Sequence, residues 1–145
     1  MVTNYSRSAD NFFSATHDEH LDQMLPQFPY GRARAAHDII GAWDGVRPVN
    51  FIEIGAGSGA FAVDLFLALK HQGKDMARVA YRGVEPSEAM KAVYRHNFLQ
   101  RTGRAPPDAW EIATAGLEDF LEEPDRYLTH EAANILVFSY STHHW

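Results

Sequence analysis

The sequence contains no cysteine, which excludes disulfide bonds, thiolate nucleophiles and zinc sites built on cysteine. It also lacks any run close to the roughly 20 apolar residues that a membrane span needs. Its first residues carry no apolar core of the kind that marks a secretory signal. We therefore expect a soluble, cytoplasmic protein without a membrane partner.

Basic residues are few, because 13 Lys and Arg stand against 19 Asp and Glu and give a formal net charge of −6. Nucleic-acid binding depends mainly on basic side chains at the phosphates, so this balance disfavours DNA or RNA as a partner. The 145 residues are 46% hydrophobic and 22% charged, which is the composition of a globular chain. Without repeats or low-complexity tracts, residues 1–145 are expected to form a single domain.

From residue 49 onward, short apolar runs alternate with segments of helical periodicity. The runs predict strands at 49–54, 77–85, 110–115 and 134–140, and the segments between them predict helices at 61–70, 87–100 and, in broken form, 116–128. Helices that cross over in this way join parallel strands with right-handed connections. The predicted fold class is α/β, with a doubly wound, mainly parallel, Rossmann-like sheet.

The residues before the first strand predict an N-terminal helical cap over 1–46. Within it, Ala35, Ile39 and Trp43 recur every four residues and share one face of a helix at 31–43. The histidine pair His17 and His20 stands in polar surroundings, which indicates a solvated helix and no metal site.

A glycine-rich loop, Glu53-Ile54-Gly55-Ala56-Gly57-Ser58-Gly59, separates the first strand from its helix. Glycine allows a sharp turn there and lets a ligand lie against bare backbone. The helix start behind the loop adds unpaired N–H groups and a partial positive charge. A strand before and a helix after the loop favour a nucleoside-binding site over a plain tight turn.

Glu85 ends the second predicted strand, and the carboxyl ends of neighbouring parallel strands open on one crevice. Its two carboxylate oxygens match the spacing of a ribose 2′,3′-diol. The alternative is a solvated glutamate stabilised by the start of the next helix. The position of Glu85 favours the ribose.

These segments resemble the class I S-adenosylmethionine-dependent methyltransferases, over about residues 49–145. FIEIGAGSG resembles the family's first motif, GVEPSEAM its second, ATAGLEDF its adenine segment and NILVFSYSTHHW its fourth strand with the substrate-facing residues beyond. The resemblance implies S-adenosylmethionine as cofactor, held by residues 47–145, with Glu53 near the methionine amine. It implies cofactor contacts from Glu53, Gly55, Ala56, Gly57, Gly59, Glu85, Pro86, Gly116, Leu117, Glu118 and Ser139, and no metal.

The expected activity is methyl transfer to an O, N or C atom of a small molecule, by a methyltransferase or an N-terminal portion of one. A histidine at the carboxyl end of the fourth strand could take the acceptor's proton, so His143 and His144 are catalytic candidates, with Tyr140 orienting the nucleophile. The alternative is a non-catalytic cofactor-binding or scaffold subunit. Tyr5, Phe12 and Phe13 resemble lid aromatics, although a capping helix would use them equally well.

A nicotinamide enzyme is the third possibility, because Ala60 also completes a G-x-G-x-x-[GA] pattern. Glu53 argues against it, since a buried acid before the glycines repels a pyrophosphate and pairs with an ammonium. Arg32 and Arg34 are candidates for the methionine carboxylate or an acidic substrate, or are simply solvated.

Two features depart from the family pattern. Gly116 stands where many relatives carry an Asp for the adenine amino group, and the sequence continues only five residues past Tyr140, without three further strands. In the expected strand order 3-2-1-4, this truncation leaves the uncharged fourth strand as an open edge. We expect a homo-oligomer or a complementing subunit to cover that edge.

Overall fold

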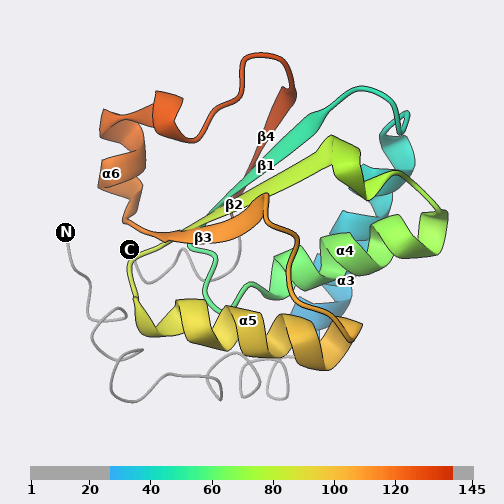
Figure 1. The fold of residues 1–145 in the computed structure, drawn as a ribbon, viewed down its shortest axis with the longest axis horizontal. Coiled ribbons are helices and arrows are strands. Elements are labelled where there is room, and N and C mark those ends of the chain that lie inside the picture. Colours follow the sequence, from blue (N-terminus) through green and yellow to red (C-terminus); the bar gives the residue numbers. More distant parts are fainter. Residues whose placement is uncertain (1–26, 139–145) are drawn as a thin grey trace.

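The computed structural model describes residues 27–138. Four parallel strands form one sheet in the order β3-β2-β1-β4 (Figure 1). The strands are β1 (Val49–Ile54), β2 (Val79–Glu85), β3 (Trp110–Thr114) and β4 (Ala133–Phe138). The predicted fold class and strand order are confirmed, as expected from right-handed crossovers between parallel strands.

Three helices, α3 (Gln27–Ala42), α4 (Ala60–Gln72) and α5 (Ala89–Thr102), cover one face of the sheet, and the short α6 (Leu117–Glu122) lies on the other (Figure 1). Two turns of 3₁₀-helix, η1 (Met76–Arg78) and η2 (Pro124–Arg126), precede β2 and β4. The predicted second strand therefore begins two residues late, at Val79. Asp75 caps η1 by accepting the Ala77 N–H at 3.0 Å, which keeps the chain helical there.

All six residues of β1 are buried, because both faces of this central strand are covered. Phe51 packs into the large cluster beneath α3, α4 and α5, whereas Ile52 and Ile54 pack with Phe120 and Tyr127 on the opposite face. Side chains alternate between the two faces of a strand. Glu53 therefore points to the face that the three helices cover.

An ion cluster ties the three helices together. The Arg32 Nε atom of α3 lies 2.6 Å from Asp64 Oδ2 of α4, and both side chains are largely buried. The guanidinium of Arg101, in α5, lies 3.6 Å from the other oxygen of Asp64. Arg32 is thus engaged within the helical layer. Arg34, its proposed companion, pairs with Asp38 one turn along α3 at the surface.

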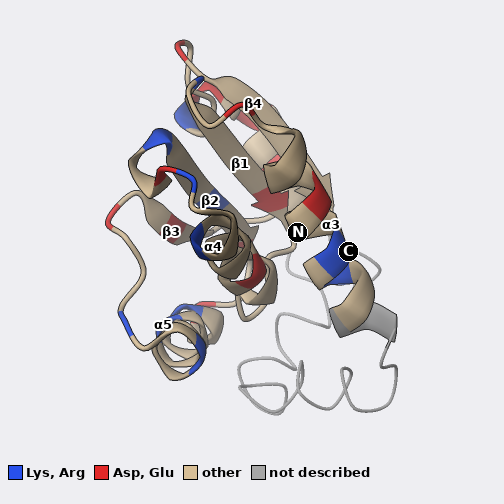
Figure 2. Ribbon diagram, turned by 90° about the vertical axis from the view of Figure 1, so that its right-hand side faces the viewer, with Lys and Arg blue, Asp and Glu red and all other residues tan. Residues whose placement is uncertain are grey.

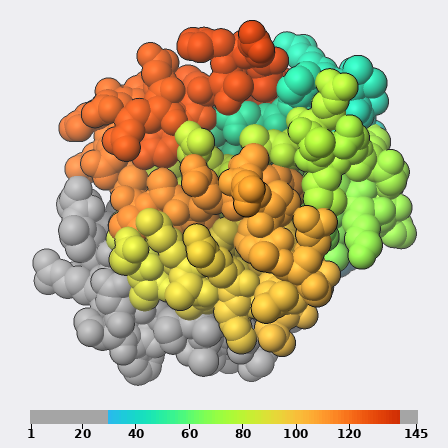
Figure 3. Space-filling view, in the orientation of Figure 1, coloured from blue at the N-terminus to red at the C-terminus, as the bar shows by residue number. Residues whose placement is uncertain are grey.

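The segment before β4 lies against the segment before β1, as the adjoining red and cyan surfaces in Figure 3 show. The Ala133 N–H donates to the Pro48 carbonyl at 2.9 Å, and Asn50 donates to both the Tyr127 carbonyl and Asn134 Oδ1. These bonds set the register of β4 on β1. None of the helices in residues 27–138 combines the length and the hydropathy of a membrane-spanning segment.

Candidate functional site

The glycine-rich loop lies directly against the carboxyl end of β2. The N–H groups of Gly55 and Ala56 donate to the Val84 carbonyl at 2.8 and 3.2 Å. Gly55, Gly57 and Gly59 have φ angles of 75°, 57° and 78°, a region that only glycine enters readily. The predicted sharp turn is present, and it brings the loop between the ends of β1 and β2.

Gly59 is the N-cap residue of α4, and it lies against Tyr94, a residue far from the loop in the sequence. A Cβ atom at this position would lie 2.1 Å from Cδ1 of Tyr94, in α5. The Tyr94 ring therefore packs on the bare Cα of Gly59, and its hydroxyl donates to the Trp110 carbonyl at 2.9 Å. No side chain caps the start of α4, which leaves the first-turn amides facing the loop side.

Glu85 is completely buried at the end of β2. Its Oε1 accepts the Gly57 N–H at 2.9 Å and its Oε2 accepts the Ser87 N–H at 3.0 Å. The carboxylate therefore holds the glycine loop to the start of the segment that leads into α5. A carboxylate oxygen has two lone pairs and can accept more than one hydrogen bond.

Glu53 lies on the adjacent strand and is 1% exposed. Its Oε1 accepts a 2.5 Å hydrogen bond from the hydroxyl of Tyr81, in β2. Its register partner in β2 is Gly83, whose missing Cβ would approach the Ala56 Cβ to 2.7 Å and the Tyr81 hydroxyl to 3.0 Å. The space above Gly83 is thus where the glycine loop and the tyrosine come together.

Burial and the adjacent negative charge of Glu53 raise the pKa of Tyr81 well above its ordinary value. The phenol therefore stays protonated and acts as a donor at physiological pH. Burial likewise raises the pKa of Tyr94. Two buried carboxylates, each held by hydrogen bonds from its neighbours, thus flank a glycine loop at the ends of adjacent strands, which is an arrangement suited to a cationic nucleoside.

Residues 33–136 match the model of a family described as "Putative S-adenosyl-L-methionine-dependent methyltransferase". The chain belongs to this family. A comparison with curated proteins found no match.

Two solved structures are similar to this family member. One is a candidate methyltransferase from Methanococcus maripaludis, at 20% identity and a TM-score of 0.56, matched over 92% of this chain and 53% of that one. The other is a candidate methyl transferase from Burkholderia thailandensis bound to S-adenosyl-homocysteine, at 23% identity and a TM-score of 0.48, matched over 60% of this chain and 22% of that one. The chain thus spans about half of the first structure and about a fifth of the second.

In this methyltransferase family member, the expected adenine segment follows β3. Gly116 begins α6, and its N–H donates to Asp119 Oδ2 at 2.8 Å. Leu117 is half-buried against the cluster of Ile52 and Ile54, and Glu118 is exposed. Asp119 thus caps α6, whereas Gly116, Leu117 and Glu118 remain proposed adenine contacts.

The structure brings the predicted residues from Glu53 to Gly59 together with Glu85, and the half-buried Pro86 follows directly. Ser139, Tyr140, His143 and His144 lie outside the described residues, as do Tyr5, Phe12, Phe13, His17 and His20. Sequence reasoning missed Tyr81, Gly83 and Tyr94. The glycine inside the second strand was the available signal, since such a glycine often marks close backbone approach.

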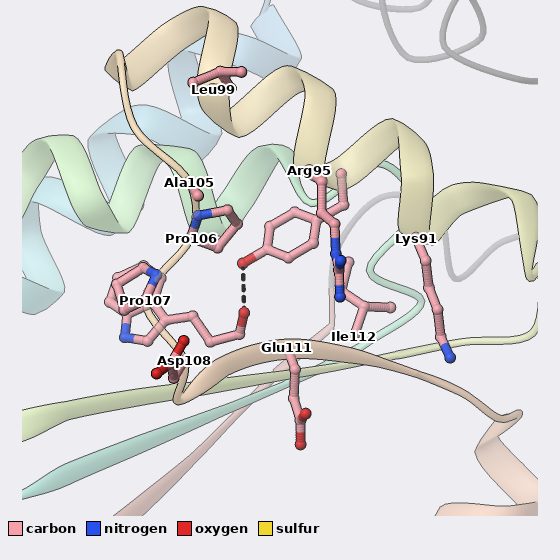
Figure 4. A pocket seen from close by; sticks show the side chains of 11 residues that line it. Lys91, Arg95, Leu99, Ala105, Pro106, Pro107, Asp108, Glu111 and Ile112 are labelled. Atoms are coloured by element: carbon pink, nitrogen blue, oxygen red, sulfur yellow. Dashed lines mark hydrogen bonds between the residues drawn. The ribbon is translucent and has the colours of Figure 1, made fainter.

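A separate cavity of about 520 Å³ lies between α5 and β3 (Figure 4). Lys91 and Arg95 line it from α5, and Pro106, Pro107 and Asp108 line it from the loop before β3. Figure 2 shows the basic residues along α5, which also include Arg101. Tyr94, which packs on Gly59 of the glycine loop, also lines this cavity, and its hydroxyl donates to the Trp110 carbonyl.

Proposed function

We propose that this chain binds S-adenosylmethionine at the glycine loop and serves methyl transfer to an O, N or C atom of a small molecule. The observation that carries the proposal is the pair of buried carboxylates, Glu53 and Glu85, at the ends of adjacent strands. Buried carboxylates need a positive partner or strong hydrogen bonds. S-adenosylmethionine carries a sulfonium and an ammonium group, whereas the pyrophosphate of a dinucleotide would be repelled.

Each part of the site has a task under this proposal. Glu85 would accept the ribose hydroxyls, since a carboxylate oxygen can accept more than one hydrogen bond, and Glu53 would pair with the methionine ammonium. The glycine loop lets the ligand approach the backbone, and the segment at Gly116 would border the adenine. Bound S-adenosylmethionine supplies an electrophilic methyl group, so the protein's main contribution is to align the reactants.

Under this proposal, residues that follow β4 remove the proton from the acceptor. We propose His143 or His144 as the base and Tyr140 as the group that orients the acceptor. Ser139 is proposed as a cofactor contact because it follows β4, whose carboxyl end lies beside that of β1 in parallel register.

Calorimetric titration tests the binding step. We expect saturable heat with S-adenosylmethionine and with S-adenosylhomocysteine, and none with NAD(H), because the charge of Glu53 beside the glycine loop would repel a pyrophosphate. Absence of binding to both sulfur ligands would contradict the proposal. Binding without methyl release, even with added partner chain, would instead identify a cofactor-binding scaffold.

We further propose that another strand covers the outer edge of β4. Within residues 27–138 no strand pairs with that edge, and Leu136 and Phe138 are 44% and 58% exposed. A hollow of about 430 Å³ lies beside it, lined by Ile39, Trp43 and Ile135 among others. An uncharged, apolar edge of this kind favours pairing with another chain.

The opposite edge of the sheet, formed by β3, is covered in part at its start. The Trp110 carbonyl of β3 accepts the Tyr94 hydroxyl, and the Trp110 N–H donates to the Pro107 carbonyl at 2.9 Å. Two edge groups of β3 are therefore already bonded, and a proline pair precedes the strand. This contrast supports β4 as the interface, formed by a second copy of the chain or by a complementing subunit.

Light scattering after size exclusion tests self-association. We expect a mass above 16.3 kDa. Leu136→Lys should lower this mass, because it places a charge at an edge that pairing would bury. Leu121→Lys is the matched control, since Leu121 is a similarly exposed leucine on α6. A wild-type monomer at every concentration would contradict self-association through β4.

A further inference from the structure

Tyr81 is a fully buried phenol in the middle of β2, on the face that the three helices cover. Its side chain runs along the strand, so that its hydroxyl lies above Gly83, two residues further on. From there it reaches across to Glu53, the register partner of Gly83 in β1. A Cβ atom at position 83 would lie 3.0 Å from the hydroxyl and 2.7 Å from the Ala56 Cβ, so a side chain there would crowd the contact.

The neighbouring Tyr94 shows what a structural phenol does in the same layer. The two rings lie 6.4 Å apart and both are buried, yet the Tyr94 hydroxyl donates to a backbone carbonyl, that of Trp110. A buried tyrosine hydroxyl needs a partner of some kind. Tyr81 differs because its partner is the carboxylate beside the glycine loop.

We propose that Tyr81 is a positioning residue for the methionine end of the cofactor, acting through Glu53; this inference rests on the function proposed above. A glutamate has three rotatable bonds, and a hydrogen bond to one oxygen restricts the carboxylate to one orientation. A carboxylate already oriented loses less freedom when an ammonium binds.

The hydrogen bond from Tyr81 is important because Glu53 lies in a buried, negatively charged environment. Tyr81 bonds Glu53 directly, the charge of Glu53 raises the pKa of both Tyr81 and Tyr94, and Glu85 adds a second negative charge at the end of β2. Donation from Tyr81 favours the charged form of Glu53, which the ammonium requires. Without that donor, the buried carboxylate would be both less fixed and less readily charged.

Tyr81→Phe tests the proposal with two ligands that share a nucleoside. S-adenosylhomocysteine carries the amino-acid group, and 5′-methylthioadenosine lacks it. We expect Tyr81→Phe to weaken S-adenosylhomocysteine binding about ten-fold, the effect of losing one hydrogen bond to a charged group, and to leave methylthioadenosine binding unchanged. Tyr94→Phe is the matched control, because it removes a buried hydroxyl bond elsewhere in the layer and should not separate the two ligands.

A double-mutant cycle distinguishes positioning from general damage. In a Glu53→Gln background, Tyr81→Phe should have little further effect on S-adenosylhomocysteine, because both changes remove the same interaction. Equal weakening of both ligands by Tyr81→Phe, or unchanged affinity for both, would overturn the inference while leaving the proposed function intact. Failure of the wild-type protein to bind either ligand would overturn the proposed function and the inference together.

Discussion

Replacing Glu85 with alanine should lower the free energy of unfolding by about 3 kcal/mol, because the buried N–H groups of Gly57 and Ser87 lose a charged acceptor. The same change should weaken S-adenosylhomocysteine binding by roughly ten- to hundred-fold, since the ribose would lose charge-assisted hydrogen bonds. Urea denaturation measures the first effect and calorimetry the second. Two effects are expected because one carboxylate serves both the loop and the proposed ligand.

Glu88→Ala is the control for this substitution. Glu88 lies three residues further along and is exposed, and its side chain accepts a hydrogen bond from Thr114 and pairs with Lys91 at the surface. Its loss should change stability by less than about 1 kcal/mol and leave cofactor affinity unchanged. If Glu85→Ala binds the ligand as tightly as the wild type does, Glu85 holds the loop and does not hold the ribose.

Gly59→Ala should lower the free energy of unfolding by about 3 kcal/mol, which combines backbone strain with overpacking. The residue has φ of +78°, and the new Cβ would lie 2.1 Å from Cδ1 of Tyr94. Tyr94 cannot easily withdraw, because its ring packs near Phe98 and its hydroxyl is bonded to Trp110. Denaturant unfolding monitored by circular dichroism measures the loss.

Gly103→Ala separates the two causes. Gly103 ends α5 with φ of +79°, but a Cβ atom there would meet nothing within 4 Å. Its substitution should therefore show strain alone, about 1 kcal/mol. Equal losses at Gly59 and Gly103 would mean that the contact with Tyr94 contributes nothing to the stability of the loop.

These expectations share a structural basis: side chains from the helices and from β2, on the same face of the sheet, hold the glycine loop and Glu53 in place. Tyr94 of α5 touches Gly59, and Tyr81 of β2 holds Glu53. The cluster of Arg32, Asp64 and Arg101 joins α3, α4 and α5 into one layer. A site carried on such packed elements keeps its geometry better than one on an isolated loop.

Much of the fold is readable in the linear pattern. The apolar runs at Val49–Ile54 and Val79–Glu85, separated by a helical segment, imply parallel pairing and one handedness of crossover. Gly55, Gly57 and Gly59 between a strand and a helix likewise indicate a backbone turn for a ligand. Such features depend on residue type and on spacing along the chain, which the sequence contains in full.

The partners of the buried polar groups are not readable in that way. Glu53 meets Tyr81, and Glu85 meets Gly57, each across 28 residues of sequence. Periodicity indicates the face on which a side chain lies, but the register between strands and the space left at Gly83 come only from packing. The order of residues was therefore enough to anticipate the family and to propose a cationic ligand. The contact between Tyr81 and Glu53 is decided only by the packing of β1 against β2.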